Sequence, residues 1–499
     1  VAILSANMPN WGITQFAIAN IGAIAVPILP GFCSTELQNI LEHAEVKVIF
    51  VSRLLAKCLE GVKTPFLEHK ILINNFATMP EGCYQPEDLD KLVPDINLNN
   101  TTPLPEVSIE EEDIASIIYT SGTTGFSKGV VLTHKNLVWD ARQCRTIQPV
   151  DETYRFLSIL PMAHTYENTL GLLLPLMFGA QVYYLDRVPT PKLLVPAMQK
   201  IRPTVVLSVP LIIEKIYKSQ VLPKFTSSKL MSKLYQFAPA RKLFNRLAGK
   251  KLMETFGGEL KFFGIGGSKL DGTVEQFLRE AKFPYAIGYG LTETAPMAAG
   301  SNPSQTFLQG VGPVMEGVQI KINDPDKSGQ GEIWIKGPNV MKGYYKRPEL
   351  TAETFTEDGW FKTGDLGSFD KKNRLAIRGR IKTMILGASG ENIYPEEIES
   401  IINNFRFVNE SLVVENSGKL VAMVHFNMEE LEKQYQKLKD QAGNYKEKIN
   451  DYIEEQKQEL RDYVNARVNN FSKLQLVLVQ HEPFEKTPTH KIKRFLYCK

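Results

Sequence analysis

The stretch "YTSGTTGFSKGVVLTH", residues 119–134, places glycines, small hydroxyl side chains and one lysine between two apolar runs. Glycine tolerates positive φ and lets the backbone approach a ligand closely, so the N–H groups of such a loop can converge on one anion. Ser and Thr hydroxyls supply further donors, and Lys128 supplies a positive point charge. The composition of this stretch therefore predicts a loop that binds polyphosphate.

The spacing of the loop differs from that of a Walker loop. The Walker motif needs G-x-x-x-x-G-K-[ST] leading into a helix, whereas Lys128 follows Ser127 and precedes Gly129 and two valines. The flanks "ASIIYT" and "GVVLTH" have the composition of strands, which predicts a hairpin-like turn between them. The alternative is a flexible Ser/Gly linker, but linkers seldom place a lysine between two strands in this way.

Length, charge and cysteine content narrow the class of protein. The chain of 499 residues, 43% of them hydrophobic, has room for about three globular domains. A net charge of +3, without a cluster of basic and aromatic residues, argues against nucleic acid binding. The cysteines are far apart and form no C-x-x-C pair, which argues against zinc and favours a reducing cytoplasm. They are Cys33, Cys58, Cys83, Cys144 and Cys498.

The apolar stretch "IGAIAVPILP", residues 21–30, is the strongest membrane candidate in the sequence. It is too short to span a bilayer, contains Pro27 and lacks the basic flank of a signal peptide, so it predicts a helix end followed by a buried strand. Because the chain begins directly with the strand pattern "VAILS", we expect the natural protein to have further residues upstream of Val1.

The order of apolar runs predicts an α/β fold. Short apolar runs alternate with helical segments from residue 1 to about 74 and again from 156 to about 289, which is typical of layered parallel βαβ units. From about Val311, shorter strands and turns predict a small β-rich subdomain. A new helix is expected near Pro395, which favours a boundary near Lys382. We therefore expect a large N-terminal domain over 1–381 and a small α+β C-terminal domain over 382–499.

Residues 428–470 are dense in lysine and glutamate at helical spacing, interrupted at Gly443 and Asn444. Acids outnumber bases slightly, so a solvated helical face is the main interpretation. A helix pair that binds a partner is the alternative.

Seven ordered motifs together resemble the acyl-adenylate-forming superfamily, and specifically the AMP-forming long-chain acyl-CoA synthetases. The resemblance extends over the whole chain and implies a two-step reaction with ATP, Mg²⁺ and CoA. A carboxylate would attack the α-phosphate of ATP to give acyl-AMP and pyrophosphate, and a thiol would then displace AMP. Both steps build negative charge on oxygen, which fixed donors, a divalent cation and a lysine can stabilise. The motifs are "YTSGTTGFSKGVVLTH", "LPMAHTYE", "GGSKL", "GYGLTETAP", "GWFKTGDLG", "GRIKTMILGASGENIYPEEIE" and "KTPTHKIKR".

The resemblance implies a nucleotide site made from several of these motifs. Thr292 matches the residue that bonds the α-phosphate, Glu293 matches a Mg²⁺ ligand, and Tyr289 lies where an aromatic ring stacks on adenine. For Glu293 considered alone, a surface carboxylate is the alternative. The β- and γ-phosphates would be bound by Thr120, Ser121, Gly122, Thr123, Thr124, Gly125 and Lys128, with Thr123 also near the metal.

The ribose and the acyl-adenylate are assigned to three further motifs. Asp365 would accept both ribose hydroxyls, with Arg380 assisting from the other side; a turn-capping aspartate is the alternative. Gly266 and Gly267, together with Gly290, would let the ligand approach the backbone, or the first two form a plain tight turn. The segment "GIGGSKL" is a poor dinucleotide fingerprint because its third glycine is missing.

The remaining candidate residues concern the reacting groups and the motion between the two steps. Lys491 matches the lysine that bridges the substrate carboxylate and the α-phosphate, although a basic tail is the alternative and His490 replaces a common glycine. His164 is expected to position the acyl group as a gate between pockets, or to be a satisfied core residue.

Lys382 matches a hinge about which a mobile C-terminal domain rotates between the two steps, although by itself it could be a surface lysine. Gly387 and Gly390 would leave room for a pantetheine arm.

The segments "TVVLSVPLIIEKIY" and "KLFNRLAGKKLMETFGG" resemble long-chain synthetases, so the resemblance implies an apolar tunnel for a fatty acid whose length stays open. Three interpretations stay open: a fatty acid:CoA ligase, a relative that loads the acyl group onto a carrier protein, and a nucleotide-binding sensor without catalysis. A cytoplasmic protein with at most peripheral membrane contact is expected, because the sequence has no anchor.

Overall fold

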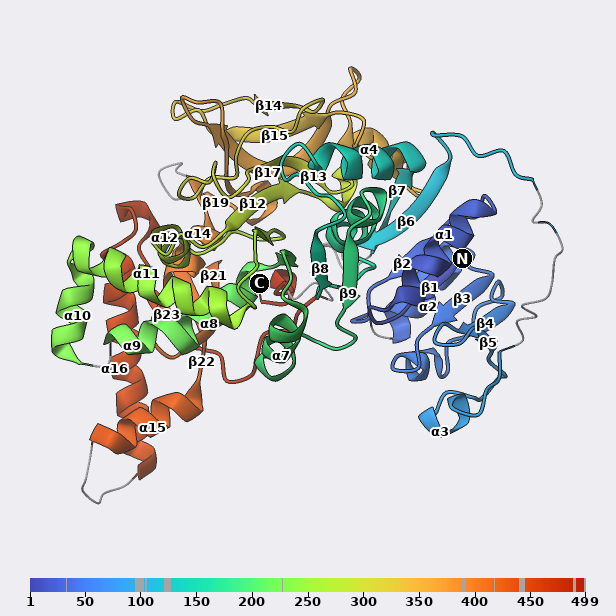
Figure 1. The fold of residues 1–499 in the computed structure, drawn as a ribbon. Helices are drawn as coiled ribbons and strands as arrows, with labels where there is room; N and C mark the ends of the chain where they lie inside the picture. The colour runs from blue at the N-terminus through green and yellow to red at the C-terminus, as the bar shows by residue number, and fades with distance from the viewer. Residues whose placement is uncertain are drawn as a thin grey trace.

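The first five strands of the chain form one sheet (Figure 1). The computed structural model describes residues 1–32, 34–94, 103, 106–120, 127–226, 228–386, 392–416, 418–438, 445–487 and 491–497. The sheet order is β2-β1-β3-β4-β5, parallel except for the last strand. Its strands are β1 (Ala2–Leu4), β2 (Val26–Ile28), β3 (Val48–Val51), β4 (His69–Leu72) and β5 (Ala77–Thr78). The helices α1 (Pro9–Asn20) and α2 (Ser34–His43) connect the first three strands and confirm the predicted βαβ pattern.

A second, six-stranded sheet forms the centre of the molecule, in the order β13-β12-β11-β10-β8-β9. Its strands are β8 (Arg155–Ser158), β9 (Gln181–Tyr184), β10 (Val205–Ser208), β11 (Phe262–Ile265), β12 (Tyr285–Gly290) and β13 (Met297–Gly300). All pairs are parallel except β12 with β13. Strand β10 is buried along its whole length, as expected for an apolar run in a parallel sheet covered on both faces. The helices that pack on this sheet include α7 (Pro191–Ile201), α8 (Pro210–Ile216) and α12 (Gly272–Glu280).

The two flanks of the opening motif are strands, as predicted. Strand β6 (Ile114–Thr120) pairs with β7 (Lys128–Thr133) in antiparallel register, and Thr120 lies opposite Lys128. Strand β16 (Gly343–Tyr344) pairs with the other edge of β7. Helix α4 (His134–Cys144) begins immediately after β7, where Thr133 and Asn136 form a capping box.

The predicted β-rich subdomain is an antiparallel sheet in the order β14-β15-β17-β18. Its strands are β14 (Gln319–Asn323), β15 (Gly331–Lys336), β17 (Phe361–Phe369) and β18 (Leu375–Arg380). The last two strands place Asp365 directly opposite Arg380.

The C-terminal residues have a separate hydrophobic core. It includes Ile398, Ile402, Val424 and Leu460, and its buried members all lie between residues 393 and 477. Helix α14 (Pro395–Ile402) starts at the predicted proline and packs on a sheet of β21 (Val408–Asn416), β22 (Lys419–Phe426) and β23 (Leu476–Val479). The chain enters this part through the short helix η5 (Ile381–Thr383) and the strands β19 (Ile385–Leu386) and β20 (Asn392–Ile393).

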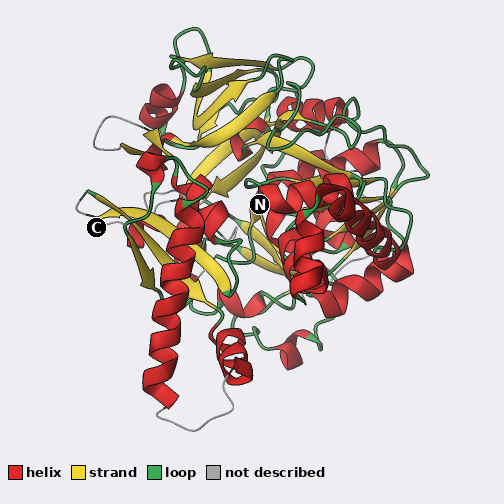
Figure 2. Ribbon diagram, turned by 90° about the vertical axis from the view of Figure 1, so that its left-hand side faces the viewer, coloured by secondary structure: helices red, strands yellow, loops and turns green. Residues whose placement is uncertain are grey.

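The charged stretch 428–470 forms α15 (Met428–Leu438) and α16 (Tyr445–Asn465). Helix α16 extends well beyond the neighbouring sheet (Figure 2). Leu460 and Val464 on α16 are fully buried, whereas Glu454, Glu455 and Gln458 are exposed. The helix therefore has a solvated face, as predicted, and a second face that completes the C-terminal core. The predicted break at Gly443 and Asn444 lies outside the described residues.

None of the described helices combines the length and the apolar character needed to cross a membrane.

Candidate active site

Asp365 is buried and has a partner on each carboxylate oxygen. Arg380 Nε lies 2.9 Å from Oδ1, and the Tyr289 hydroxyl donates a hydrogen bond of 2.9 Å to Oδ2. Burial raises the pKa of Asp365, and the charge of Arg380 opposes that rise. Each oxygen keeps a second lone pair, so the carboxylate can still accept two hydroxyl groups from a ligand.

Tyr344 connects two of the predicted site residues, although no motif in the sequence indicated it. Its hydroxyl donates a hydrogen bond of 2.9 Å to Glu293 Oε1, and Lys128 Nζ lies 5.0 Å from the centre of its ring. Burial and the positive charge of Lys382 lower the pKa of Lys128, while Glu293 raises it. One buried tyrosine thus holds the candidate metal ligand beside the candidate phosphate lysine.

The reason for missing Tyr344 is its position in the fold. It lies in the two-residue strand β16, which pairs with β7 from more than two hundred residues away. No short-range sequence pattern reports such a pairing.

Lys491 faces the same group of charges. Its backbone N–H donates to Thr487 Oγ1 at 3.2 Å and its carbonyl accepts from the Thr487 N–H at 2.8 Å, so two hydrogen bonds join Lys491 to Thr487. Desolvation and the charge of Arg380 lower the pKa of the Lys491 ammonium, and Asp365 and Glu293 oppose that change. Lys491 therefore lies within electrostatic range of these three side chains, and its role in the reaction stays a prediction.

His164 begins α5 (Thr165–Glu167) as its N-cap. The imidazole Nδ1 accepts a hydrogen bond of 3.2 Å from the Tyr166 N–H, so the neutral ring carries its proton on Nε2. Burial, and to a lesser extent the charge of Lys491, lowers the pKa of His164 to about 4. A ring that stays neutral at pH 7 is a weak base, which favours the predicted positioning role over proton abstraction.

The structural reason for a glycine differs among the predicted glycine positions. A side chain at Gly290 would clash with the Pro296 carbonyl, 1.6 Å from the position of a Cβ, so only glycine fits. Gly267 has a φ of +89°, which favours glycine at the turn after β11. At Gly266 a Cβ would lie 3.3 Å from the ring of Tyr166. The space predicted for a ligand at Gly266 is therefore bordered by this ring, and close approach of adenine stays a prediction.

Other predicted residues are near the site or outside the described residues. Thr292 lies in η4 (Thr292–Thr294), next to Glu293, and Thr120 ends β6 opposite Lys128. Lys382 is exposed in η5, close enough to Lys128 to lower its pKa. The predictions outside the described residues are Ser121, Gly122, Thr123, Thr124, Gly125, Gly387, Gly390 and His490.

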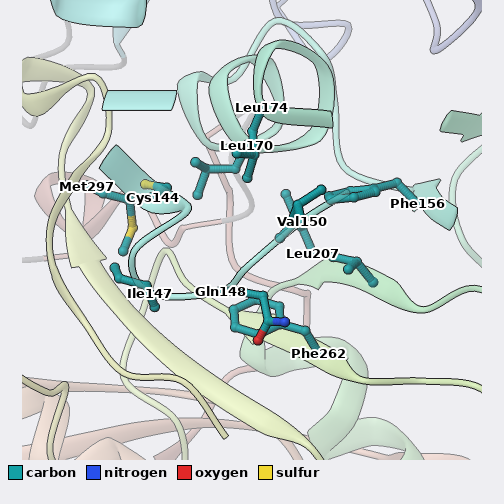
Figure 3. A pocket seen from close by; sticks show the side chains of 11 residues that line it. Cys144, Ile147, Gln148, Val150, Phe156, Leu170, Leu174, Leu207, Phe262 and Met297 are labelled. Carbon is teal, nitrogen blue, oxygen red and sulfur yellow. The ribbon is translucent and has the colours of Figure 1, made fainter. Parts of the chain in front are cut away.

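An apolar pocket lies beside the helical segment that follows His164 (Figure 3). Leu170 and Leu174 line it from that segment, Leu207 and Phe262 from the central sheet, and Met297 from β13. Among the described residues that line it, Gln148 is the one with an amide side chain, so the walls of the pocket are almost entirely apolar.

Comparison with known families decides the class of protein. A model of the family described as AMP-binding enzyme matches residues 1–345, more than half of the chain. The protein belongs to the AMP-binding enzyme family.

Curated relatives of this AMP-binding enzyme match along most of the chain. A protein of Arabidopsis thaliana named long chain acyl-CoA synthetase 6, peroxisomal, is 29% identical, over 99% of this chain and 75% of its own. The long-chain-fatty-acid–CoA ligase heimdall of Drosophila melanogaster is 30% identical, over 81% of this chain and 63% of its own. These names agree with the family resemblance found in the motifs.

Solved structures share the fold at low sequence identity. The ATP-bound RpMatB-BxBclM chimera B1 has a TM-score of 0.75 at 22% identity, covering 99% of this chain and 87% of that one. O-succinylbenzoate coenzyme A synthetase (MenE) from Bacillus subtilis, in complex with ATP and magnesium ion, has a TM-score of 0.72 at 22% identity, covering 99% and 88%. The likeness confirms the predicted α/β fold class.

The side chains of this AMP-binding enzyme suit Mg²⁺ better than a metal that needs three or more protein ligands. Within the described ranges, no group of three His, Cys, Asp or Glu side chains could hold a metal. Glu293 presents a half-buried carboxylate, and Tyr344 occupies only one of its oxygens. Mg²⁺ typically binds through one or two carboxylates together with phosphate oxygens and water, which this donor set allows.

Polar contacts join the C-terminal part to the rest of the AMP-binding enzyme. Lys269 Nζ lies 3.1 Å from Glu397 Oε1. Asp271, which caps α12, also accepts hydrogen bonds from Ser400 Oγ at 3.2 Å and from Asn404 Nδ2. These contacts hold α14 against the N-terminal end of α12.

Proposed function

We propose that this AMP-binding enzyme is a long-chain fatty acid:CoA ligase that forms acyl-AMP and pyrophosphate from ATP, and then acyl-CoA and AMP. The observation that supports it best is that Glu293 and Asp365, from two separate motifs, lie close enough to Lys491 of a third motif to affect its pKa. Curated relatives with long-chain acyl-CoA ligase names support the same activity.

In the first half-reaction, the carboxylate of the fatty acid attacks the α-phosphate. The Lys491 ammonium would lie between carboxylate and phosphate and offset the charge that builds on their oxygens. Lys128 and the loop hydroxyls would bind the departing β- and γ-phosphates, and Thr292 would donate to the α-phosphate. Asp365 would accept the ribose hydroxyls and so fix the sugar relative to Lys491.

Mg²⁺ would be held by Glu293 and Thr123 and would supply positive charge to the phosphates. The protein's own contribution at this point is Tyr344, whose hydrogen bond fixes the Glu293 carboxylate.

In the second half-reaction, a thiol attacks the acyl carbonyl. We propose that residues 382–499 form a mobile domain that rotates at Lys382, removing Lys491 and bringing the loop with Gly387 and Gly390 towards the thiol. The separate hydrophobic core of the C-terminal part supports rotation as a rigid unit.

For the acyl chain, we propose the apolar pocket beside Leu170 and Leu174 as the binding region. His164 begins the helical segment that leads into this pocket and would position the carboxyl end of the chain.

Product analysis by mass spectrometry tests the proposed function. The protein is incubated with Mg-ATP and acids from acetate to oleate, with and without CoA. We expect AMP, pyrophosphate and a long-chain acyl-CoA. Acyl-AMP that accumulates regardless of CoA would indicate a carrier protein as thiol acceptor, and absence of pyrophosphate with every acid would contradict ligase activity and favour a sensor.

A further inference from the structure

The helical hairpin of α10 (Lys229–Gln236) and α11 (Ala238–Thr255) lies at the edge of the molecule (Figure 1). It exposes five large apolar side chains. Leu230, Leu234 and Phe237 are spaced i, i+4, i+7, so they follow one side of α10 and its end. Leu243 and Leu247 are spaced i, i+4 on α11. Three of the five are more than 60% exposed, namely Leu230, Phe237 and Leu247.

The opposite side of this hairpin is firmly packed. The ring of Phe225 stacks on Tyr235 at 4.9 Å and on Phe244 at 5.6 Å between ring centres. Arg241 makes an ion pair of 2.9 Å with Glu280, and the Tyr235 hydroxyl donates to Asn245 at 2.8 Å. Because these contacts fix the inner face, the outer leucines cannot turn inward and remain in water.

Positive charge accompanies the exposed leucines. No Asp or Glu occurs between Glu214 and Glu254, although the whole chain is nearly neutral at +3. Among ion pairs between described residues, none involves the exposed basic side chains of the hairpin. These are Lys233, Lys242, Arg246, Lys250 and Lys251.

The basic and apolar side chains are adjacent in the sequence. Lys233 precedes Leu234, Lys242 precedes Leu243, and Arg246 precedes Leu247. Neighbouring residues on a helix are about 100° apart, so these three cations flank the apolar side chains, and Lys250 continues the α11 stripe at i+3 from Leu247. A soluble surface rarely combines exposed leucines with unopposed cations unless it binds a partner.

We propose that the outer face of α10 and α11 docks on the surface of an anionic phospholipid bilayer. A bilayer offers both chemistries in layers: headgroup phosphates at the level of the lysines and arginine, and hydrocarbon at the level of the leucines and Phe237. An acidic protein would satisfy the cations but leaves the leucines unexplained, and a second copy of this face would bring like charges together. This docking adds peripheral contact to a chain in which the sequence showed no anchor, and it does not depend on the proposed enzymatic function.

Sedimentation with vesicles tests the proposal without any catalytic readout. The full chain is mixed with vesicles of phosphatidylcholine alone or with added phosphatidylglycerol, at low and high salt. We expect binding to the anionic vesicles only, weakened by salt. Arg246→Glu with Leu247→Ser should lower this binding by about tenfold or more, because it reverses one charge and removes one apolar contact.

The matched control is Lys57→Glu with Leu54→Ser, which alters an exposed lysine and an exposed leucine far from the hairpin in sequence. It should bind vesicles like the unaltered protein. Equal binding by the hairpin variant, or no binding by the unaltered protein, would overturn the proposal. So would a dimer in analytical ultracentrifugation that the hairpin variant abolishes, since the face would then bind a second copy.

Discussion

At the scale of single residues, Lys491 gives the sharpest prediction. Lys491→Ala should slow acyl-AMP formation by about a hundredfold or more, because it removes the ammonium that would offset the charge between carboxylate and α-phosphate. Thioester formation from preformed acyl-AMP should survive. Pyrophosphate release and acyl-CoA formation, measured separately, check this.

Lys493→Ala is the control for Lys491, because it removes a neighbouring charge of the same basic tail. It should leave both half-reactions close to those of the unaltered protein. Equal losses in the two half-reactions of Lys491→Ala would refute the assignment.

Tyr344 permits a graded test of how the site binds Mg-ATP. Tyr344→Phe removes the hydrogen bond to Glu293 and keeps the ring beside Lys128, so we expect a loss of about 1 kcal/mol, or roughly fivefold, in Mg²⁺ affinity. Tyr344→Leu also removes the cation–π contact, worth about 0.5–1 kcal/mol, and should weaken ATP binding further. Magnesium titrations of pyrophosphate release measure both variants. Identical behaviour of the two variants would show that the ring has no role.

Glu167 makes stability depend on pH. It is fully buried, no described residue makes a hydrogen bond to its Oε2, and burial raises its pKa to about 8 from 4.5. Because the folded state then holds a proton that the unfolded state releases, stability falls as pH rises from 4.5 through 8. Glu167→Gln keeps the shape without the charge, so it should be more stable than the unaltered protein by up to about 5 kcal/mol above pH 8. Thermal unfolding of both proteins between pH 5 and 9 checks this. Melting temperatures that change with pH in the same way in both proteins would contradict the prediction.

The functional residues that could be predicted from sequence are those within dense motifs. Asp365, Glu293 and Lys491 stand among glycines, threonines or lysines whose pattern indicates a site. Tyr344 and Glu167 were missed because their importance comes from burial and from partners far away in sequence, which only the fold specifies.

At the scale of elements, the linker η5 decides whether the C-terminal part can rotate. Lys382→Pro fixes one φ angle at the proposed hinge and restrains Ile381 as well. We expect acyl-AMP formation within about twofold of normal and overall acyl-CoA turnover reduced about tenfold or more. Single-turnover and steady-state assays separate the two quantities. Lys382→Ala, which keeps the backbone free, is the matched control, and normal turnover by the proline variant would remove the hinge assignment.

Elements with local signals were predicted well. The antiparallel pair β6 and β7 follows from two apolar runs around a glycine-rich loop, and the parallel strands follow from short, fully buried runs. The two faces of α16 were predicted only in part, because the leucine and valine that enter the C-terminal core are sparse among its charges. Strand β16 was not predicted, since a two-residue strand has no period to detect.

At the scale of the whole molecule, the motif order implied that two parts of the chain share one site. It did not predict the contacts that hold these two parts together. Those contacts centre on Asp271, which caps α12 and accepts hydrogen bonds from Ser400 and Asn404 of α14 and its C-terminal end. In the described arrangement Lys491 faces Asp365 and Glu293, so these contacts favour the state suited to the first half-reaction.

Ser400→Ala with Asn404→Ala should therefore shift the balance between the two states. The double variant leaves the α12 cap intact but removes both donors to Asp271 Oδ2, at a cost of about 1 kcal/mol for the docked state. Acyl-AMP formation should slow by up to about fivefold, while thioester formation from preformed acyl-AMP stays equal or rises. Lys47→Ala, which breaks an exposed ion pair of 3.8 Å in the first sheet region, should change neither rate. A loss confined to thioester formation would show that the Asp271 contacts stabilise the other state, and the assignment of the described arrangement to adenylation would then fail.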